Sequence, residues 1–448
     1  MMNNTCVRNP IDSKQKIILF LPLIAIEIYL LVTLVLYQFG PYPWPTKNPN
    51  LFWSLIAAYH LAFILGYFAC MKMKYCSRET INMDNTMSII TKCCLVVNLP
   101  ILLLTITRRF GLPRIVNITE LFERVMHGLR SPAEVYHYQF SQEFVDFGGK
   151  GLTLFLLATS LIAFAAIPLG LIYFKKLSTT FRSILLVNLI LEVSKWIGTG
   201  TNKGIFDLVI TAVVLFALAM MSHLYINKID RKKVIIATSV LVVGITIFLL
   251  FFNKAIGSRL SGDAWLEYPV GGIFPTRDCA LFKILPAVLQ KPIALLALYV
   301  TQGYYAFSLA TTIPWIPMFG LGGSMFLQEY IDKYIFNISQ FTYSDRLIQF
   351  GWDPRVNWHS LYVWIGNDLS LYGVILFMLV FGFVFAYFYR VSLIDQNALA
   401  KLIFVFLTIM ALFIPANNQV LGFLFPCIEF IACVLCYVIF CKTQPLKK

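Results

Sequence analysis

Apolar runs of about twenty residues, separated by polar connections, make up most of this chain of 448 residues. A helix of that length matches the hydrocarbon thickness of a bilayer and satisfies its own backbone polar groups there. The runs predict about ten transmembrane helices, at residues 17–37, 51–71, 88–107, 152–174, 184–197, 205–224, 234–252, 361–389, 402–415 and 420–440. The pattern predicts an all-α, polytopic integral membrane protein, with residues 1–448 forming a single transmembrane domain.

Composition agrees with this pattern. Hydrophobic residues make up 59% of the chain and charged residues 13%, and the mean hydropathy is +0.75. A soluble domain needs far more polar surface, so that class is excluded. The net charge of +14 would suggest nucleic acid in a soluble protein. Here the basic residues gather at the ends of apolar runs, so we expect no nucleic-acid partner.

The basic residues also set the orientation. With a cytoplasmic N-terminus, the short inside connections hold more than half of the 36 Lys and Arg residues, as the positive-inside rule requires. Two long segments, 108–150 and 254–360, then face outward, because long segments translocate despite positive charge. In the first, the amphipathic tract 118–128 fits a helix in the headgroup region or a surface helix capping the bundle. Residues 254–360 are called the second outward segment.

An apolar piece lies inside the second outward segment, at residues 292–315. It is rich in Tyr, Gly and hydroxyl side chains, which a simple spanning helix would contain less often. A crossing here would also reverse all later segments and place Arg390 and Lys401 outside. We therefore predict a re-entrant or interfacial segment that is buried against protein.

Aromatic and basic residues alternate along the second outward segment. Aromatic faces stack on sugar rings, although an interfacial aromatic belt explains the same composition, and both interpretations stay open. Guanidinium groups match the geometry of phosphate. The candidate sugar-binding residues are Tyr304, Tyr305 and Trp352, and the candidate anion-binding residues are Arg259, Arg277, Arg346 and Arg355.

Ionisable residues within apolar runs are costly and point to function. Glu192 and Lys195 are three residues apart and can neutralise each other on one helix. Lys195 leads into GTGTNKGIFD, residues 198–207, whose backbone amides together with Lys203 suit a phosphate at a helix start. A tight helical hairpin with a snorkelling Lys203 fits equally well. Glu429 has the pattern of a buried structural carboxylate.

Three tracts resemble the bacterial O-antigen (Wzy) polymerase family: GTGTNKGIFD at 198–207, YVTQGYYAFSLATTIPWIPMFGLGGSMF at 299–326 and NWHSLYVWIGNDLSLYG at 357–373. The resemblance implies a GT-C-like membrane glycosyltransferase in the bacterial cytoplasmic (inner) membrane. Its expected reaction joins undecaprenyl-diphosphate-linked oligosaccharide repeat units into a surface polysaccharide at the periplasmic face. The two outward segments would then be periplasmic loops. Membrane lipid and a chain-length regulator are the further partners that the resemblance implies.

The implied reaction gives roles to the candidate residues. A sugar hydroxyl must attack an anomeric carbon while diphosphate leaves, which requires a cationic clamp and a base. The expected catalytic residues are His359, Arg259 and Asp368, although a lone His at a membrane interface is often structural. Asp345 and Asp353 are alternative bases. The expected diphosphate-binding residues are Arg277, Arg346, Arg355, Lys195 and Lys203.

Other functional classes compete with the polymerase. An O-antigen ligase shares the plan and also carries a His near the start of a late external helix. A lipid-linked oligosaccharide flippase fits less well, because such transporters have short external loops and internal repeats. The connection 38–50 contains no acidic residue, which excludes a metal and carboxylate site there. We expect a metal-independent enzyme without a cofactor, and a purely structural membrane protein is the remaining alternative.

Overall fold

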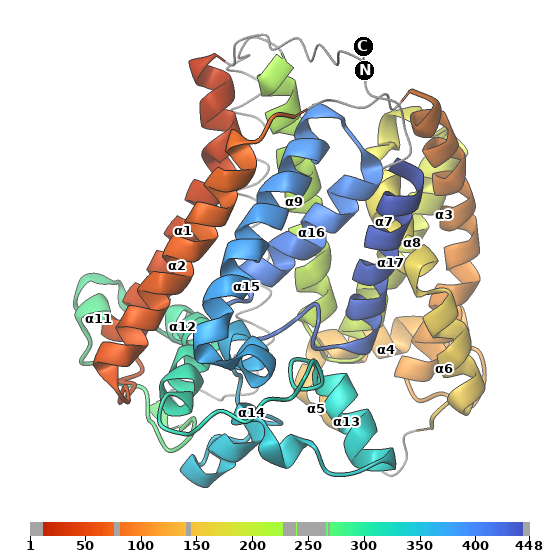
Figure 1. Ribbon diagram of the computed structural model, residues 1–448. Coiled ribbons are helices and arrows are strands. Elements are labelled where there is room, and N and C mark those ends of the chain that lie inside the picture. The colour runs from red at the N-terminus through yellow and green to blue at the C-terminus, as the bar shows by residue number, and fades with distance from the viewer. Residues whose placement is uncertain are drawn as a thin grey trace.

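The computed structural model consists of helices joined by loops (Figure 1), and it describes residues 12–75, 81–139, 145–226, 239, 266–267 and 269–441. Within these residues, the one β feature is an isolated antiparallel bridge between Val270 and Ile273. Apart from residue 239, the predicted span 234–252 lies outside the described residues, as does the candidate residue Arg259.

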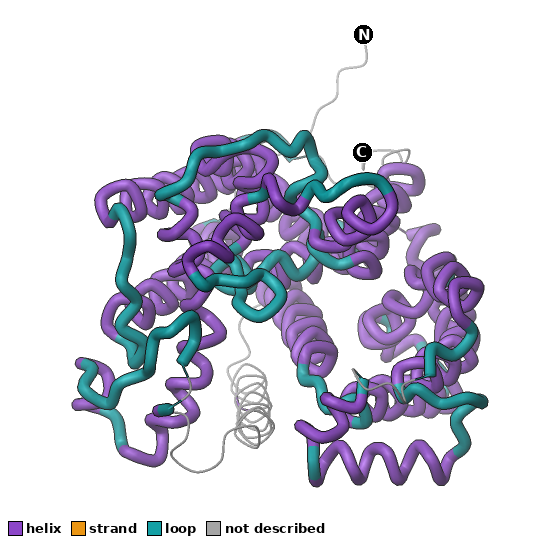
Figure 2. Tube along the Cα trace, turned by 90° about the horizontal axis from the view of Figure 1, so that it is seen from below, coloured by secondary structure: helices purple, strands orange, loops and turns teal. Residues whose placement is uncertain are grey.

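In the part of the chain that the structure describes, ten helices form the body, and they stand side by side when viewed from below (Figure 2). In chain order these are α1 (Ser13–Phe39), α2 (Pro49–Lys72), α3 (Ile81–Arg109), α6 (Gly149–Ala158), α7 (Ser160–Ile172), α8 (Thr179–Ile197), α9 (Lys203–Ile226), α15 (Leu361–Ile394), α16 (Ala398–Leu412) and α17 (Leu424–Cys441).

Several of these helices are long and apolar enough to cross a membrane. Within the described residues, six helices meet this criterion, namely α1, α2, α3, α9, α15 and, beyond the ten above, α12 (Ala287–Ala310). The pair α6 and α7, bent by 44°, adds a seventh if it is one span. The helices α16 and α17 are apolar but shorter. The predicted all-α, membrane-embedded class is therefore confirmed, and the count of about ten spans stays a prediction.

The most extensive contact between two helices of the body joins α2 to α15. A Cβ added at Gly66 would lie 1.9 Å from the carbonyl oxygen of Leu379, and one added at Gly382 would lie 2.1 Å from that of Phe63. The two backbones therefore touch directly, as small residues allow in membrane bundles. Next to this contact, the Phe63 ring packs 5.8 Å from that of Phe385.

The outward segments gather at one end of the bundle, which is the lower end in Figure 1. The first segment contributes α4 (Ile118–Arg130) and α5 (Pro132–Tyr138). The second contributes α11 (Ala280–Ile284), α13 (Met325–Tyr334), α14 (Tyr343–Arg346) and the 3₁₀ turns η3 (Ser339–Phe341) and η4 (Leu347–Phe350). The functional candidates of both segments therefore share one face of the protein.

The helix α12 occupies the apolar piece of the second outward segment. Its second half is buried, and Gly303 packs so closely that an added Cβ would lie 2.2 Å from the carbonyl oxygen of Pro415. Before α12, the Thr276 amide donates to the Pro41 carbonyl at 2.7 Å, and after it, Asn48 Nδ2 donates to the Thr311 carbonyl at 3.0 Å. The chain on both sides of α12 thus contacts the same connection between α1 and α2.

The contact between α2 and α15 leads to a stability prediction. Gly66→Ala and Gly382→Ala each place a methyl group against a backbone oxygen, so we expect a loss of roughly 1–3 kcal/mol or more from the free energy of unfolding. The midpoint of thermal unfolding of the purified protein in detergent measures this. Gly151→Ala is the matched control, because a Cβ there meets no atom within 4 Å. Equal midpoints for all three variants would contradict the prediction.

Candidate functional site

The start of α15 holds the second outward segment in place. Asn367 Oδ1 accepts from the Tyr343 amide at 2.7 Å, and Asn367 Nδ2 donates to the Gly322 carbonyl at 2.7 Å. The Trp315 indole donates to the Asn367 carbonyl at 3.1 Å. One buried residue on α15 thereby ties together three parts of the segment that are far apart in sequence.

The predicted catalytic residue Asp368 lies beside Asn367 and makes a similar tether. Its Oδ1 accepts from the amides of Gly320 at 2.8 Å and Gly322 at 2.9 Å. Gly320 has a φ of +88°, a conformation that favours glycine, and a Cβ added at Gly323 would lie 2.8 Å from Asp368 Oδ2. In this conformation the carboxylate holds the glycine turn, which is a positioning task.

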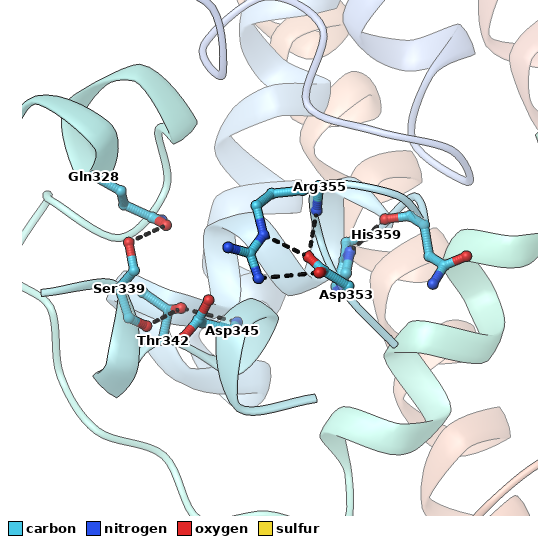
Figure 3. Close-up of polar contacts among 8 residues, drawn as sticks. Gln328, Ser339, Thr342, Asp345, Asp353, Arg355 and His359 are labelled. Carbon is cyan, nitrogen blue, oxygen red and sulfur yellow. Dashed lines mark hydrogen bonds and ion pairs between the residues drawn. The ribbon is translucent and has the colours of Figure 1, made fainter. Parts of the chain in front are cut away.

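An arginine and an aspartate form a charged pair between η4 and α15 (Figure 3). Arg355 Nε lies 2.9 Å from Asp353 Oδ1, and Nη2 lies 3.0 Å from Oδ2, so the contact is bidentate. The Arg355 side chain is 72% exposed. Hydrogen bonding to Asp353 raises the pKa of Arg355, and the same bond lowers the pKa of Asp353. The outer edge of the guanidinium group, with its remaining N–H groups, is accessible.

Asp345 is a carboxylate without a hydrogen-bond partner among the described residues. Thr342 caps α14, its hydroxyl accepting from the Asp345 amide at 3.1 Å, and this places the Asp345 side chain near Arg355 (Figure 3). Among the described residues its carboxylate makes no hydrogen bond or ion pair. Partial burial, with the neighbouring charges of Asp332 and Asp353, raises the pKa of Asp345, while Arg355 opposes the rise. A raised carboxyl pKa in an accessible place is typical of a general base.

Asp332 shows the contrasting arrangement. Its Oδ1 accepts from the amides of Ile338 at 2.6 Å and Ser339 at 3.1 Å, and its Oδ2 accepts from the Ser339 hydroxyl. Gln328 Oε1 accepts from the same hydroxyl at 3.5 Å (Figure 3). This carboxylate is therefore used in shaping the turn after α13.

His359 lies behind the pair of Arg355 and Asp353 and is only 1% exposed. Its Nδ1 contacts the Asn357 carbonyl at 3.0 Å, and its Nε2 is buried without a hydrogen bond among the described residues. Burial lowers the pKa of His359 from 6.5 to about 4, although the backbones of Asn357 and Ser344 oppose this. The imidazole is neutral near pH 7 and acts from within the fold, so its place suits a positioning residue.

The other predicted anion-binding residues are dispersed. Arg346 donates to the carbonyls of Pro314 at 2.6 Å and Thr342 at 3.2 Å, and burial lowers its pKa. Arg277 is exposed on the chain before α11. Lys195 and Lys203 lie at the facing ends of α8 and α9, apart from Asp345 and Arg355.

The three predicted sugar-binding aromatics are packed inside the protein. Tyr304 is 0% exposed and its hydroxyl bonds that of Thr33 at 3.0 Å, while Tyr305 and Trp352 pack with ring centroids 5.0 Å apart. An exposed pair, Tyr330 and Tyr334 on α13, presents its rings at the surface instead, with centroids 4.8 Å apart. The spacing of four residues on an amphipathic helix is the signal that could have singled out this pair.

Comparison with known proteins gives no relative: no family model, no curated protein and no solved structure matches the chain. Within the described residues, no group of three or more His, Cys, Asp or Glu side chains could hold a metal ion. The candidate groups for function are therefore Asp345, Asp353, Arg355 and His359, which the fold brings together at the end of the bundle where both long segments lie, and the charges on α8 and α9.

The burial of His359 predicts a pH dependence of stability. Between the ordinary pKa of 6.5 and the folded value of about 4, the unfolded chain binds a proton that the folded chain does not. The free energy of unfolding therefore falls as the pH drops through this window, by roughly 3 kcal/mol in total.

The variant His359→Gln should lose this part of the acid sensitivity, because glutamine does not titrate. Thermal midpoints measured at several values between pH 4 and 6.5 test it. The control is His137→Gln, since His137 is exposed on α5. An acid slope in His359→Gln as steep as that of the wild type would show that the imidazole is not the responsible group.

Proposed function

We propose that this protein is a membrane glycosyltransferase that polymerises undecaprenyl-diphosphate-linked oligosaccharide repeat units at the periplasmic face of the bacterial inner membrane. The observation that carries the proposal is the unpartnered Asp345 carboxylate, with its raised pKa, beside the exposed Arg355 guanidinium. When a hydroxyl attacks and a diphosphate leaves, a base is needed to accept the hydroxyl proton and a cation is needed to stabilise the diphosphate.

The reaction assigns a role to each group. Asp345 removes the proton of an acceptor sugar hydroxyl while that oxygen attacks the anomeric carbon of the donor. The bond from the anomeric carbon to the diphosphate breaks, and its electron pair leaves with the diphosphate. Arg355, held in plane by Asp353 at 2.9 Å, offers its remaining N–H groups to the developing negative charge. His359 is buried and supports the segment that carries Asp353 and Arg355.

The aromatic pair on α13 suits the oligosaccharide. Tyr330 and Tyr334 are 61% and 54% exposed, so their ring faces are available for stacking on sugar rings. The pair and Asp345 belong to the same outer segment, because Asp332 on α13 lies close enough to raise the pKa of Asp345. An extended substrate could therefore contact the tyrosine pair while a reacting hydroxyl lies at Asp345.

The contacts of α12 support placing these groups on the outer side. Because the chain before and after α12 contacts the connection between α1 and α2, the segment enters and leaves at one face. This favours the re-entrant interpretation and keeps the orientation expected from the positive-inside rule.

The proposed base and clamp predict a loss of polymerisation. Asp345→Asn removes the proton acceptor, and we expect polymer formation to fall by about 10²–10⁴-fold. Arg355→Gln should reduce it as well, and Arg355→Lys should not restore it, because lysine lacks the planar fork. Polymer length in cells and transfer between lipid-linked units by the purified protein measure both effects.

The matched controls are Asp278→Asn and Lys283→Gln. Asp278 and Lys283 form an exposed ion pair with a distance of 3.0 Å near α11, away from Asp345. Both controls should make polymer of normal length. Full activity of Asp345→Asn would remove this residue from the mechanism.

Deletion of the gene distinguishes the classes of activity. A polymerase defect leaves single repeat units attached to the surface anchor. A ligase defect instead leaves polymer on the lipid carrier, and a flippase defect retains lipid-linked units inside. If analysis of the surface polysaccharide shows the ligase defect or the flippase defect, the proposed function is overturned.

A further inference from the structure

Six ionisable residues from four helices meet at the outer end of the bundle. They are called the six-residue cluster and comprise Arg109 at the end of α3, Glu192 and Lys195 near the end of α8, Lys203 and Asp207 at the start of α9, and Glu429 in α17. Three are basic and three are acidic, so the formal charge sums to zero. Ionisable residues at such positions are costly, and each needs a physical account.

One ion pair in the cluster is complete. Lys195 Nζ lies 2.7 Å from Glu192 Oε2, and the Trp196 indole donates to Glu192 Oε1 at 2.9 Å. The Lys195 side chain is 10% exposed, so this pair is enclosed. Its geometry is that of a structural salt bridge, with both carboxylate oxygens occupied.

The other two cations are held by aromatic faces. The Arg109 guanidinium lies 4.3 Å from the centre of a Trp196 ring, and Lys203 Nζ lies 3.8 Å from the centre of the Phe423 ring. Neither makes a hydrogen bond or ion pair with a carboxylate among the described residues. Cation–π contacts orient a cation while leaving its N–H donors unused. Arg109 and Lys203 therefore keep hydrogen-bonding capacity.

The remaining carboxylates also lack direct partners. Asp207 Oδ1 is buried and accepts no hydrogen bond, and Glu429 has none within the described residues. Both lie within electrostatic range of Lys203. A cluster built only for stability would bring these groups into contact, because an unsatisfied buried ion is strongly destabilising.

The backbone of the glycine-rich turn does not provide an anion site. The amides of Gly198, Gly200 and Thr201 donate to carbonyls of the preceding helix end, at 2.9, 3.0 and 3.2 Å. A Cβ added at Gly204 would lie 1.7 Å from an atom of the Trp196 ring. These glycines allow close packing, so an anion would have to be bound by side chains.

We propose that Arg109 and Lys203 bind the phosphate of a lipid that enters from the outer leaflet, with Asp207 and Glu429 balancing the charge of Lys203 when the site is empty. The site is separate from Asp345 and Arg355. The inference rests on the proposed function in one respect, the identity of the lipid that supplies the phosphate. That lipid is either a polyprenyl diphosphate or a membrane phospholipid.

The surroundings fit a lipid ligand. Arg109 is exposed and Lys203 is partly exposed, so a phosphate can reach both. On α8, the helix that carries Glu192 and Lys195, Leu186 and Ile190 are 57% and 54% exposed. They provide an apolar surface for acyl or prenyl chains. The start of α9 at Lys203 adds the positive end of a helix dipole.

Binding of farnesyl diphosphate to the full-length protein in detergent, titrated by native mass spectrometry, tests the site. Lys203→Gln and Arg109→Gln should each weaken binding about tenfold or more, because each removes a charged hydrogen-bond donor. Asp207→Asn should strengthen binding, because it removes a competing negative charge. The change in affinity should therefore have opposite signs in Lys203→Gln and Asp207→Asn, which a loss of folding would not produce.

The control cation is Arg182, which stacks on Phe174 at 4.9 Å at the other end of α8. Arg182→Gln and Asp278→Asn should bind farnesyl diphosphate as the wild type does. Polymer formation, which Asp345→Asn tests, is measured separately, so the inference and the proposed reaction can fail independently. Displacement by phosphatidylglycerol would assign the site to phospholipids, and resistance to it would assign the site to the prenyl carrier. Unchanged affinity in Lys203→Gln and Arg109→Gln, or equal binding of farnesol, would overturn the inference.

Discussion

The direct contact between the backbones of α2 and α15 fixes the position of α15, to which the second outward segment is tied. At Gly66 and Gly382 there is no room for a side chain, so α15 has one position against α2. The outer end of α15 then carries Asn367 and Asp368, whose side chains hold the segments around Tyr343 and the glycine turn. A bilayer supplies no hydrophobic force between helices, so such close packing and hydrogen bonding determine the arrangement.

Between the tether and the packed body, α15 departs from helical geometry. Ser370 has φ 64° and ψ 164°, and its hydroxyl accepts from the Gly373 amide at 3.1 Å. The break separates the first turns, which serve the outer segment, from the long part that packs on α2. A non-glycine residue in this region of backbone conformation is strained, and such strain persists only where the surroundings enforce it.

The two candidate sites are close enough to share packing. The Phe413 ring lies 5.5 Å from Phe206, which precedes Asp207, and 6.4 Å from Trp358, which precedes His359. The connection after α16 also bonds the glycine turn, since Asn418 Nδ2 donates to the Gly323 carbonyl at 2.8 Å. A polymerase must bring two lipid-linked substrates together, and this shared packing gives the proposed phosphate site and the proposed base a common support.

The sequence by itself determined the membrane class, because apolar runs of bilayer length have no other stable setting. It also singled out Arg355 and Lys203, since charges near apolar runs are few. Only the tertiary structure decided which groups are available: it covers Tyr304 and Trp352, encloses His359, uses Asp368 as a tether, and leaves Asp345, Tyr330 and Tyr334 open. It also brings Arg109 to Lys203 from helices far apart in sequence. The physical reason is that burial and hydrogen-bond partners depend on contacts between distant segments, which local patterns of residues do not encode.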